Sequence, residues 1–415
     1  MKFEENTFEE LLCGKFACGC GRRGAPVYLR RGEVYGELEN LSRSFARGKR
    51  AALVASRRFL SERGEQTLGA LCAGGAEAVK IAVSRRFDSA LENIGALFSL
   101  AEDVKLIVAC ESELYDVAAY FSALKNLPLV YAAFSPEADG LFAPTACVKI
   151  KGKPERIFAE NPRYVIVDET LLRQAEEGRV ASAFASLASG VVSLIDYRVR
   201  GALTGEFCRE SYHLARGAIS AALGSVSKED MPVKLLESRL IVAAAENHTL
   251  GAIARGGESA VAELLESSGK IRLSSAERKF AAALLLLDLY AAYFSSPHEN
   301  LLSVPDYAAR AEALSAYTGY GKGELLKGIL ASAALADESK LAPYAARLKE
   351  EIETLRGWAE KLAAVYLRLG GRDIFCNYSF QELKKAVCRA ADLPDAFSVL
   401  TLMRESGALE HFSEL

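Results

Sequence analysis

The chain has 415 residues, of which 50% are hydrophobic and 25% are charged, and its formal net charge is −3. This composition is typical of a soluble globular protein with one large domain or two, and the near-neutral charge excludes a chain that binds polyanions over its whole surface. Basic residues do gather in residues 15–64, where twelve Lys and Arg accompany four Glu. We interpret this stretch as a solvated basic face rather than a nucleic-acid site, because no stacking motif or nucleic-acid-binding fold goes with it.

The N-terminus and the cysteines favour a cytoplasmic protein. Residues 1–5 lack the basic start and the apolar core of a signal peptide. The longest apolar run, residues 280–294, contains Asp288 and is too short to span a bilayer. Nine cysteines, an odd number scattered along the chain, do not resemble a disulfide framework. We therefore expect a cytoplasmic protein with no membrane and no nucleic-acid partner.

The first motif along the chain is Cys18-Gly-Cys20-Gly21. Two cysteines are half of a tetrahedral zinc site, and no second pair at ligand spacing follows them in the sequence. His248 and His298 likewise do not pair with another His or Cys at such a spacing. The sequence therefore does not favour a zinc site at this motif.

Predicted strands and helices alternate over residues 51–168. Short β-rich runs predict buried strands at residues 51–55, 79–83, 104–109 and 127–131. Between them, apolar residues at helical spacing predict helices at residues 87–101 and 113–125. Residues 147–151 and 155–158 predict a hairpin, and residues 164–167 a further strand. The alternation predicts a Rossmann-like α/β domain with a mostly parallel sheet over residues 1–170.

After residue 170 the pattern becomes helical. Ala/Leu/Glu-rich segments with a period of about 3.6 residues occupy residues 235–254, 274–294, 340–369 and 380–391. Glycine pairs and a Ser-Ser-Pro turn separate several of these segments. We therefore expect an all-helical domain over residues 171–415.

Several patches of the chain together resemble one protein family. They are Cys18-Gly-Cys20-Gly21, the segment PRYVIVDETLL from Pro162, the surroundings of Ser186, Ser259 and Ser275, and the segment FSVLTLMRESG from Phe397. This set is similar to the sn-glycerol-1-phosphate dehydrogenase branch of the iron-containing alcohol dehydrogenase and dehydroquinate synthase superfamily. The resemblance implies a dehydroquinate synthase-like architecture and an NAD(P)-linked oxidoreductase that uses a divalent metal. It also implies a small-molecule ligand in the cleft between the two domains.

In that family a glycine-rich turn brings backbone amides to the diphosphate of NAD(P). The resemblance aligns this turn with Cys110 to Asp116, where Cys110 and Ser112 replace glycines and Asp116 is retained. Glu111 and Glu113 add negative charge beside a dianion, which opposes ordinary diphosphate binding. The same glutamates also suit an acidic helix N-terminus, and we prefer this structural interpretation. The turn is therefore expected to be a degenerate cofactor site.

Asp139 is the best candidate for a substrate-facing group. The family's loop over the nicotinamide contains Pro-Thr and ends in Asp-Gly; here Ala133-Phe134 replaces the former, and Asp139-Gly140 matches the latter. Asp-Gly is also a common turn, so a substrate contact and a plain turn both remain open.

The resemblance places the family's metal ligands, an aspartate and two histidines, at Ser186, Ser259 and Ser275. A neutral hydroxyl is a poor ligand for zinc or another divalent transition metal, and the family's hydride transfer depends on the metal as a Lewis acid. We therefore expect a diverged member that has lost this chemistry and acts as a non-catalytic ligand-binding or regulatory protein.

The alternative is an active NAD(P)-linked oxidoreductase acting on a small (phospho)polyol through a remodelled metal site. Glu258, Glu263 and Glu277 lie near the replaced ligands in the implied fold and could hold a harder ion such as Mg²⁺ or Mn²⁺. Solvated glutamates on helix faces are the simpler interpretation of these residues.

Overall fold

A computed structural model describes residues 12, 18–20, 25–83, 103–143, 145–150, 153–224, 227–254, 256–267, 273–295, 305–372, 374, 380–393 and 398–409. Contacts group the chain into two units. Unit 1 consists of Met1–Val180 and Ser225–Gly251, and unit 2 of Ala181–Gly224 and Ala252–Leu415. This grouping adds residues 171–180 and 225–251 to the segment expected to form the first domain.

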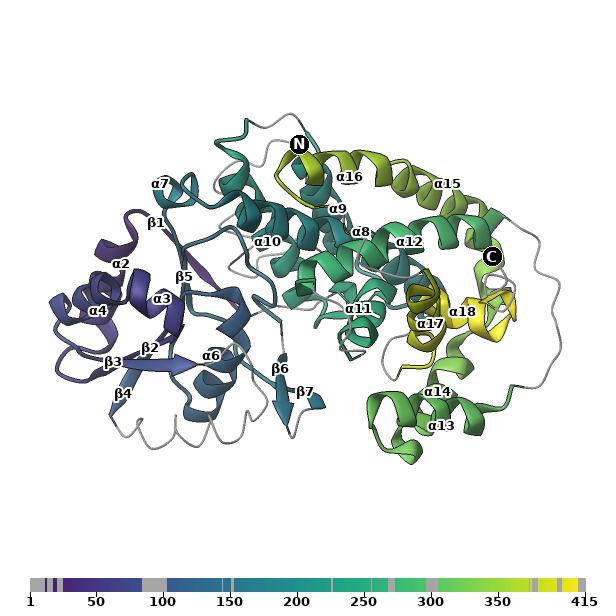
Figure 1. The fold of residues 1–415 in the computed structure, drawn as a ribbon, viewed down its shortest axis with the longest axis horizontal. Coiled ribbons are helices and arrows are strands. Elements are labelled where there is room, and N and C mark those ends of the chain that lie inside the picture. Colours follow the sequence, from purple (N-terminus) through teal and green to yellow (C-terminus); the bar gives the residue numbers. More distant parts are fainter. Residues whose placement is uncertain are drawn as a thin grey trace. The chain divides into compact units, whose positions relative to one another are not determined.

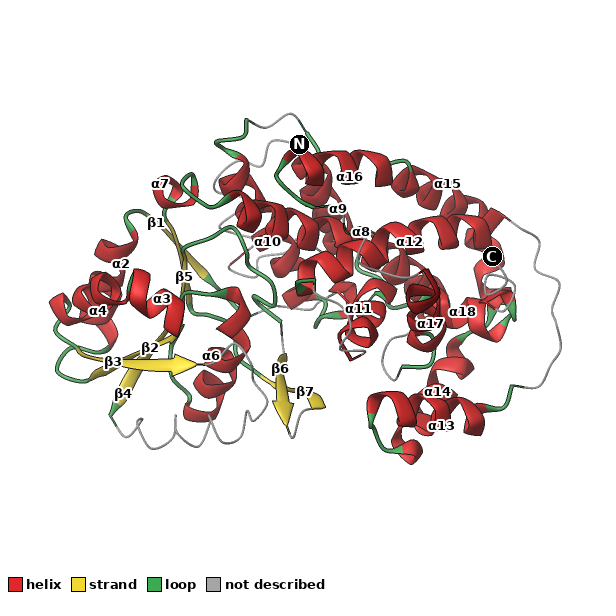
Figure 2. Cartoon of the chain, viewed as in Figure 1, coloured by secondary structure: helices red, strands yellow, loops and turns green. Residues whose placement is uncertain are grey.

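Unit 1 is built on a six-stranded sheet (Figure 1, Figure 2). In sheet order the strands are β1 (Tyr28–Arg31), β8 (Tyr164–Val167), β5 (Leu129–Ala133), β4 (Val104–Ala109), β2 (Arg50–Ser56) and β3 (Glu77–Val83). Every neighbouring pair is parallel, which confirms the predicted α/β class. The predicted helix at residues 87–101 lies outside the described residues.

Side chains of the central strands alternate between two buried faces, as the pleat of a strand requires. On one face Leu53, Val108 and Val130 pack with α2 (Val34–Phe45), α3 (Arg57–Glu62) and α4 (Gly64–Ala73). On the other face Tyr131 of β5 meets Tyr115 of α6 (Ser112–Lys125), with ring centroids 5.9 Å apart. Burial on both faces explains why these strands consist of nearly continuous apolar residues.

The remaining elements of unit 1 include the predicted hairpin and one helix from far along the chain. Strands β6 (Thr145–Ile150) and β7 (Lys153–Phe158) pair antiparallel, which confirms the hairpin. The short helix α7 (Glu169–Leu172) follows β8. Helix α10 (Met231–His248) is held to unit 1 by the ion pair of Arg31 with Glu237, at 3.0 Å.

Because the strands are parallel, the residues that follow them share one edge of the sheet. Ser56 ends β2, Cys110 follows β4, Phe134 follows β5 and Asp168 follows β8. The Asp168 carboxylate caps α7, since it accepts a hydrogen bond from the amide of Leu171 at 3.0 Å. This edge is where an open α/β sheet binds ligands.

The described part of unit 2 contains helices and no strand (Figure 2). The helices are α8 (Glu177–Thr204, which begins in unit 1), α9 (Arg209–Ala222), η1 (Ala252–Ala254), α11 (Gly257–Ser267), α12 (Ser275–Ser295), α13 (Tyr307–Thr318), α14 (Lys322–Leu335), η2 (Glu338–Tyr344), α15 (Ala345–Arg356), α16 (Ala359–Arg368), α17 (Phe380–Ala390) and α18 (Val399–Glu405). Among the described helices, α8 alone is long and apolar enough to cross a membrane. Its apolar window is 83% buried inside the protein, as in the core helix of a globular fold.

Candidate functional site

The turn after β4 places a buried carboxylate at the carboxyl edge of the sheet. Glu111 is 7% exposed, and its carboxylate accepts hydrogen bonds from the amide and the hydroxyl of Ser56, at 2.6 and 2.8 Å. Ser56 is 3% exposed and caps α3 by accepting a hydrogen bond from the amide of Phe59 at 3.1 Å. Charge-assisted hydrogen bonds are strong, and more so away from water. Glu111 is therefore a fixed part of the turn.

This role differs from the one that the sequence suggested for Glu111. Glu111 precedes α6 as its N-cap residue, but its side chain makes no capping hydrogen bond and turns to β2 instead. Burial, with the charge of Glu111, raises the pKa of the Cys110 thiol well above its ordinary value. Ser112 begins α6, and an Asp116 oxygen lies 3.5 Å from where a Cβ would stand on Gly140. Cys110, Ser112 and Asp116 thus share the turn with an acidic group.

The loop after β5 holds Asp139 in an ion-pair network of unit 1. Arg239 of α10 lies 3.8 Å from Asp139, and the same guanidinium donates two hydrogen bonds to Glu246, at 2.8 and 3.1 Å. Arg179 donates to Glu137 of the same loop at 2.8 Å. These contacts give Asp139 a structural partner, and a substrate contact stays a prediction.

The three serines that the resemblance aligns with the family's metal ligands lie on separate helices of unit 2. Ser186 is in α8, where its carbonyl accepts a hydrogen bond from the hydroxyl of Ser189 at 2.8 Å. Ser259 is in the first turn of α11, and its hydroxyl donates to the Glu258 carboxylate at 3.1 Å. Ser275 is exposed at the start of α12. None of these side chains offers the charged or imidazole ligand that the family uses.

Glu258 is buried in unit 2 and is held by hydroxyl groups. Its carboxylate accepts hydrogen bonds from Ser193 at 2.6 Å and from Ser259 at 3.1 Å. Burial raises the pKa of Glu258. A metal ion needs a deprotonated carboxylate, so this environment does not favour coordination.

Glu277 and Glu263 have other partners. Arg372 donates two hydrogen bonds to the Glu277 carboxylate, at 2.8 and 2.9 Å. Burial acts to raise the pKa of Glu277, but the hydrogen bonds from Arg372 and Ser274 have the larger combined effect. The pKa of Glu277 is therefore below its ordinary value. The hydroxyl of Tyr320 donates to Glu263 at 3.3 Å. In the described part of the chain, the three glutamates do not bring three ligand atoms within 4.8 Å of one another.

Asp196, a buried carboxylate of α8, was not expected from the sequence. It accepts hydrogen bonds from the amides of Gly257 at 2.7 Å and Val399 at 2.6 Å, and from the hydroxyl of Tyr290 at 3.3 Å. Burial raises the pKa of Asp196 to about 8. A lone acidic residue directly after the mostly apolar run at residues 191–195 was the signal that could have identified it. Asp196 joins the N-terminal ends of α11 and α18 to Tyr290 within α12, and so serves the structure of unit 2.

The structure brings together three residues of unit 1 whose spacing in the sequence does not favour a zinc site. His248 Nε2 lies 3.0 Å from Sγ of Cys18 and 3.1 Å from Sγ of Cys20. The two sulfur atoms are 2.8 Å apart. The sequence could not reveal this cluster, because 230 residues separate Cys18 from His248.

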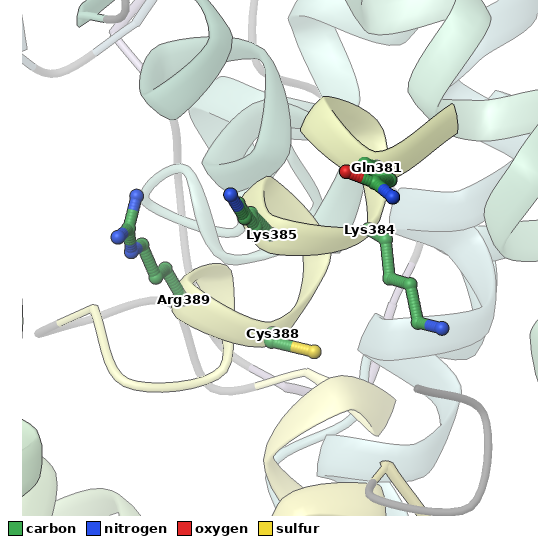
Figure 3. A pocket seen from close by; sticks show the side chains of 5 residues that line it. All are labelled: Gln381, Lys384, Lys385, Cys388 and Arg389. Carbon is green, nitrogen blue, oxygen red and sulfur yellow. The ribbon is translucent and has the colours of Figure 1, made fainter. Parts of the chain in front are cut away.

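Two basic pockets lie in unit 2. One, shown in Figure 3, has a volume of about 400 Å³ and is lined from α17, with basic side chains predominating: Gln381, Lys384, Lys385, Cys388 and Arg389. The other has a volume of about 350 Å³ and is lined by four arginines and two glutamates among other residues: Arg198, Arg209, Arg216, Arg347, Glu350 and Glu351. Four positive and two negative charges leave this second lining net positive, which suits a small anion.

Comparisons with known proteins fit this fold. No protein-family model matches the chain. The chain is similar to the glycerol-1-phosphate dehydrogenase [NAD(P)+] of Bacillus licheniformis, with 25% identity over 211 residues that cover 48% of the chain and 52% of the relative. The enzyme of the same name from Bacillus velezensis is 24% identical over 301 residues, which cover 68% of the chain and 75% of the relative. The chain thus spans about half the length of the first of these relatives.

Solved structures with this fold include iron-containing alcohol dehydrogenases. That of Corynebacterium glutamicum has a TM-score of 0.56 at 13% identity, covering 96% of the chain and 97% of the neighbour. That of Thermococcus thioreducens has a TM-score of 0.54 at 12% identity, covering 94% and 98%. The similarity extends over both units and supports an α/β unit followed by a helical one.

Proposed function

Because the chain is a diverged member of the superfamily of glycerol-1-phosphate dehydrogenases and iron-containing alcohol dehydrogenases, we propose that it has lost metal-dependent hydride transfer and acts as a non-catalytic binding protein. The observation that carries the proposal is the buried Glu111 carboxylate in the turn that would meet the cofactor's diphosphate.

Electrostatics supports this interpretation of the turn. The Glu111 carboxylate already accepts hydrogen bonds from the amide and the hydroxyl of Ser56, at 2.6 and 2.8 Å. A diphosphate in the same turn would bring like charges together, at a cost on the order of 4 kcal/mol per unit pair at about 4 Å near a protein surface. An uncharged turn would carry no such cost. NAD(P) therefore does not fit this turn.

The residues at the metal positions also do not fit a catalytic ion. Ser186, Ser259 and Ser275 supply hydroxyls only, while Glu258 and Glu277 are engaged by hydroxyls and by Arg372. Without a Lewis acid the superfamily's hydride transfer has no means of stabilising the alkoxide.

The ligand that we propose is a small anion, bound in the arginine-lined pocket of unit 2. Arg198 and Arg216 lie 3.5 and 3.8 Å from Glu351, so their charges are partly balanced, whereas Arg209 donates to His213, a neutral partner. Arg209 leaves an uncompensated positive charge at this pocket. Inorganic phosphate should raise the melting temperature of the wild type, and Arg209→Ala should reduce that rise.

The test of lost catalysis is a turnover assay. The purified chain is incubated with glycerol 1-phosphate and NAD⁺ or NADP⁺, with Zn²⁺, Ni²⁺, Mg²⁺ or Mn²⁺ in turn, and the Bacillus subtilis relative serves as the positive control. We expect no cofactor reduction above background in any of these mixtures. Metal-dependent reduction that Glu277→Gln abolishes would contradict the proposal and favour an active enzyme with a remodelled carboxylate site. A cytoplasmic location is part of the same proposal.

A further inference from the structure

We propose that Cys18, Cys20 and His248 of unit 1 bind a zinc ion. Their three ligand atoms form a nearly equilateral triangle with sides of 2.8, 3.0 and 3.1 Å. Non-bonded carbon atoms pack at about 3.5–4.0 Å, and the two sulfur atoms, at 2.8 Å, are closer than that. A cluster this tight gathers three of the side-chain atoms that zinc prefers.

The geometry allows an ion without rebuilding the backbone. Zinc binds sulfur at about 2.3 Å and imidazole nitrogen at about 2.0 Å, so it can sit above the face of this triangle. Tetrahedral coordination would widen the separation of the sulfurs to about 3.8 Å, a change that rotation of the cysteine side chains can supply. Gly19, between the cysteines, has no neighbour within 4 Å of where its Cβ would stand, so the turn has room to adjust.

The surroundings favour a cation at this place. His248 is 1% exposed and is the last residue of α10, whose C-terminal carbonyls carry partial negative charge. The next residue but one, Leu250, has φ +54°, and this left-handed turn ends the helix beside the cluster. Asn247 donates a hydrogen bond to the carbonyl of Ala25 at 3.0 Å, which fixes the end of α10 against the chain that follows the cysteines. Cys20 is exposed, so the ion would be accessible to a chelator.

The role of such an ion is structural. It would join Cys18 to His248 across 230 residues and so hold the second segment of unit 1 to the first. A clip that closes a long loop removes conformational freedom from the unfolded chain, which stabilises the folded one. This site is separate from Ser186, Ser259 and Ser275, which belong to unit 2, and the inference is independent of the proposed function.

The experiment measures zinc in the full-length protein, purified without chelators or a histidine tag and under a non-thiol reductant. Elemental analysis should find about one equivalent in the wild type after dialysis. The C18S/C20S variant should lose it, and Cys72→Ser, a change of an exposed cysteine in α4, should keep it. X-ray absorption at the zinc edge should show at least two sulfur ligands and one imidazole.

A second arm applies if the variants do not fold. Stripping zinc from the wild type with a chelator should make two further cysteines reactive toward a thiol reagent and lower the melting temperature, and added zinc should reverse both changes. The proposal is overturned if reduced wild-type protein binds no zinc, or if zinc removal leaves thiol reactivity unchanged. It is also overturned if C18S/C20S keeps the full equivalent. Zinc retained by C18S/C20S would place the ion elsewhere and would also challenge the proposed loss of the catalytic metal. A wild type without zinc would overturn the present inference but would not contradict that proposed loss.

Discussion

The hydrogen bonds between Glu111 and Ser56 can be measured directly. Glu111→Ala removes the carboxylate, and Ser56→Ala removes the hydroxyl while leaving the amide. The Glu111 carboxylate lies 2.6 Å from the amide nitrogen of Ser56 and 2.8 Å from its hydroxyl oxygen, and both residues are less than one-tenth exposed. A hydrogen bond to a charged group contributes about 1.5–3 kcal/mol, so Glu111→Ala, which loses two, should lower the free energy of unfolding by about 3–6 kcal/mol.

A double-mutant cycle separates this contact from other effects of each change. Ser56 also caps α3 through the amide of Phe59, so Ser56→Ala loses about 1 kcal/mol that has nothing to do with Glu111. The coupling free energy between the two positions isolates the hydroxyl–carboxylate bond, and we expect about 1.5–3 kcal/mol from chemical denaturation of the four proteins. A coupling below about 0.5 kcal/mol, within the additivity of independent sites, would refute the claim that Glu111 is fixed in this turn.

Two further outcomes follow from unit 2. The folded-state pKa of Asp196, about 8, lies above the ordinary 3.8, so its contribution to stability is full below about pH 4 and is lost as the pH rises through 8. Between pH 5 and 8 the wild type should therefore lose up to about 1.4 kcal/mol per pH unit relative to Asp196→Asn, and equal slopes in denaturation at each pH would contradict this. Three substitutions should restore the superfamily's metal ligands in a C18S/C20S background: Ser186→Asp, Ser259→His and Ser275→His. Elemental analysis of this variant should find one zinc equivalent. A folded variant without zinc would show that the three positions do not converge.

The sequence predicted most of the fold because the relevant signals are local. Buried parallel strands such as β4 and β5 are nearly continuous apolar runs, and their ends were located to within two residues. Helix ends were harder. The segment at residues 235–254 was expected to be one helix, but α10 stops at His248 because Leu250 and Gly251 adopt positive φ, and that conformation leaves little trace in helical periodicity.

The candidate site was less predictable, since its contacts join residues far apart in the chain. The acidic character of Glu111 was evident, but its bond to Ser56 depends on β2 and β4 lying side by side in the sheet. The cysteine–histidine cluster depends on α10 joining unit 1. No spacing rule within either segment contains that information.

The most direct test of the central claim is calorimetric titration of the purified wild type with NADH and with NADPH. Since the turn after β4 holds the buried Glu111 carboxylate, we predict no saturable heat up to millimolar cofactor, which corresponds to a binding free energy weaker than about −4 kcal/mol. A dissociation constant in the micromolar range or below, about −8 kcal/mol or better, would show that the fold still accepts the dinucleotide and would contradict the account.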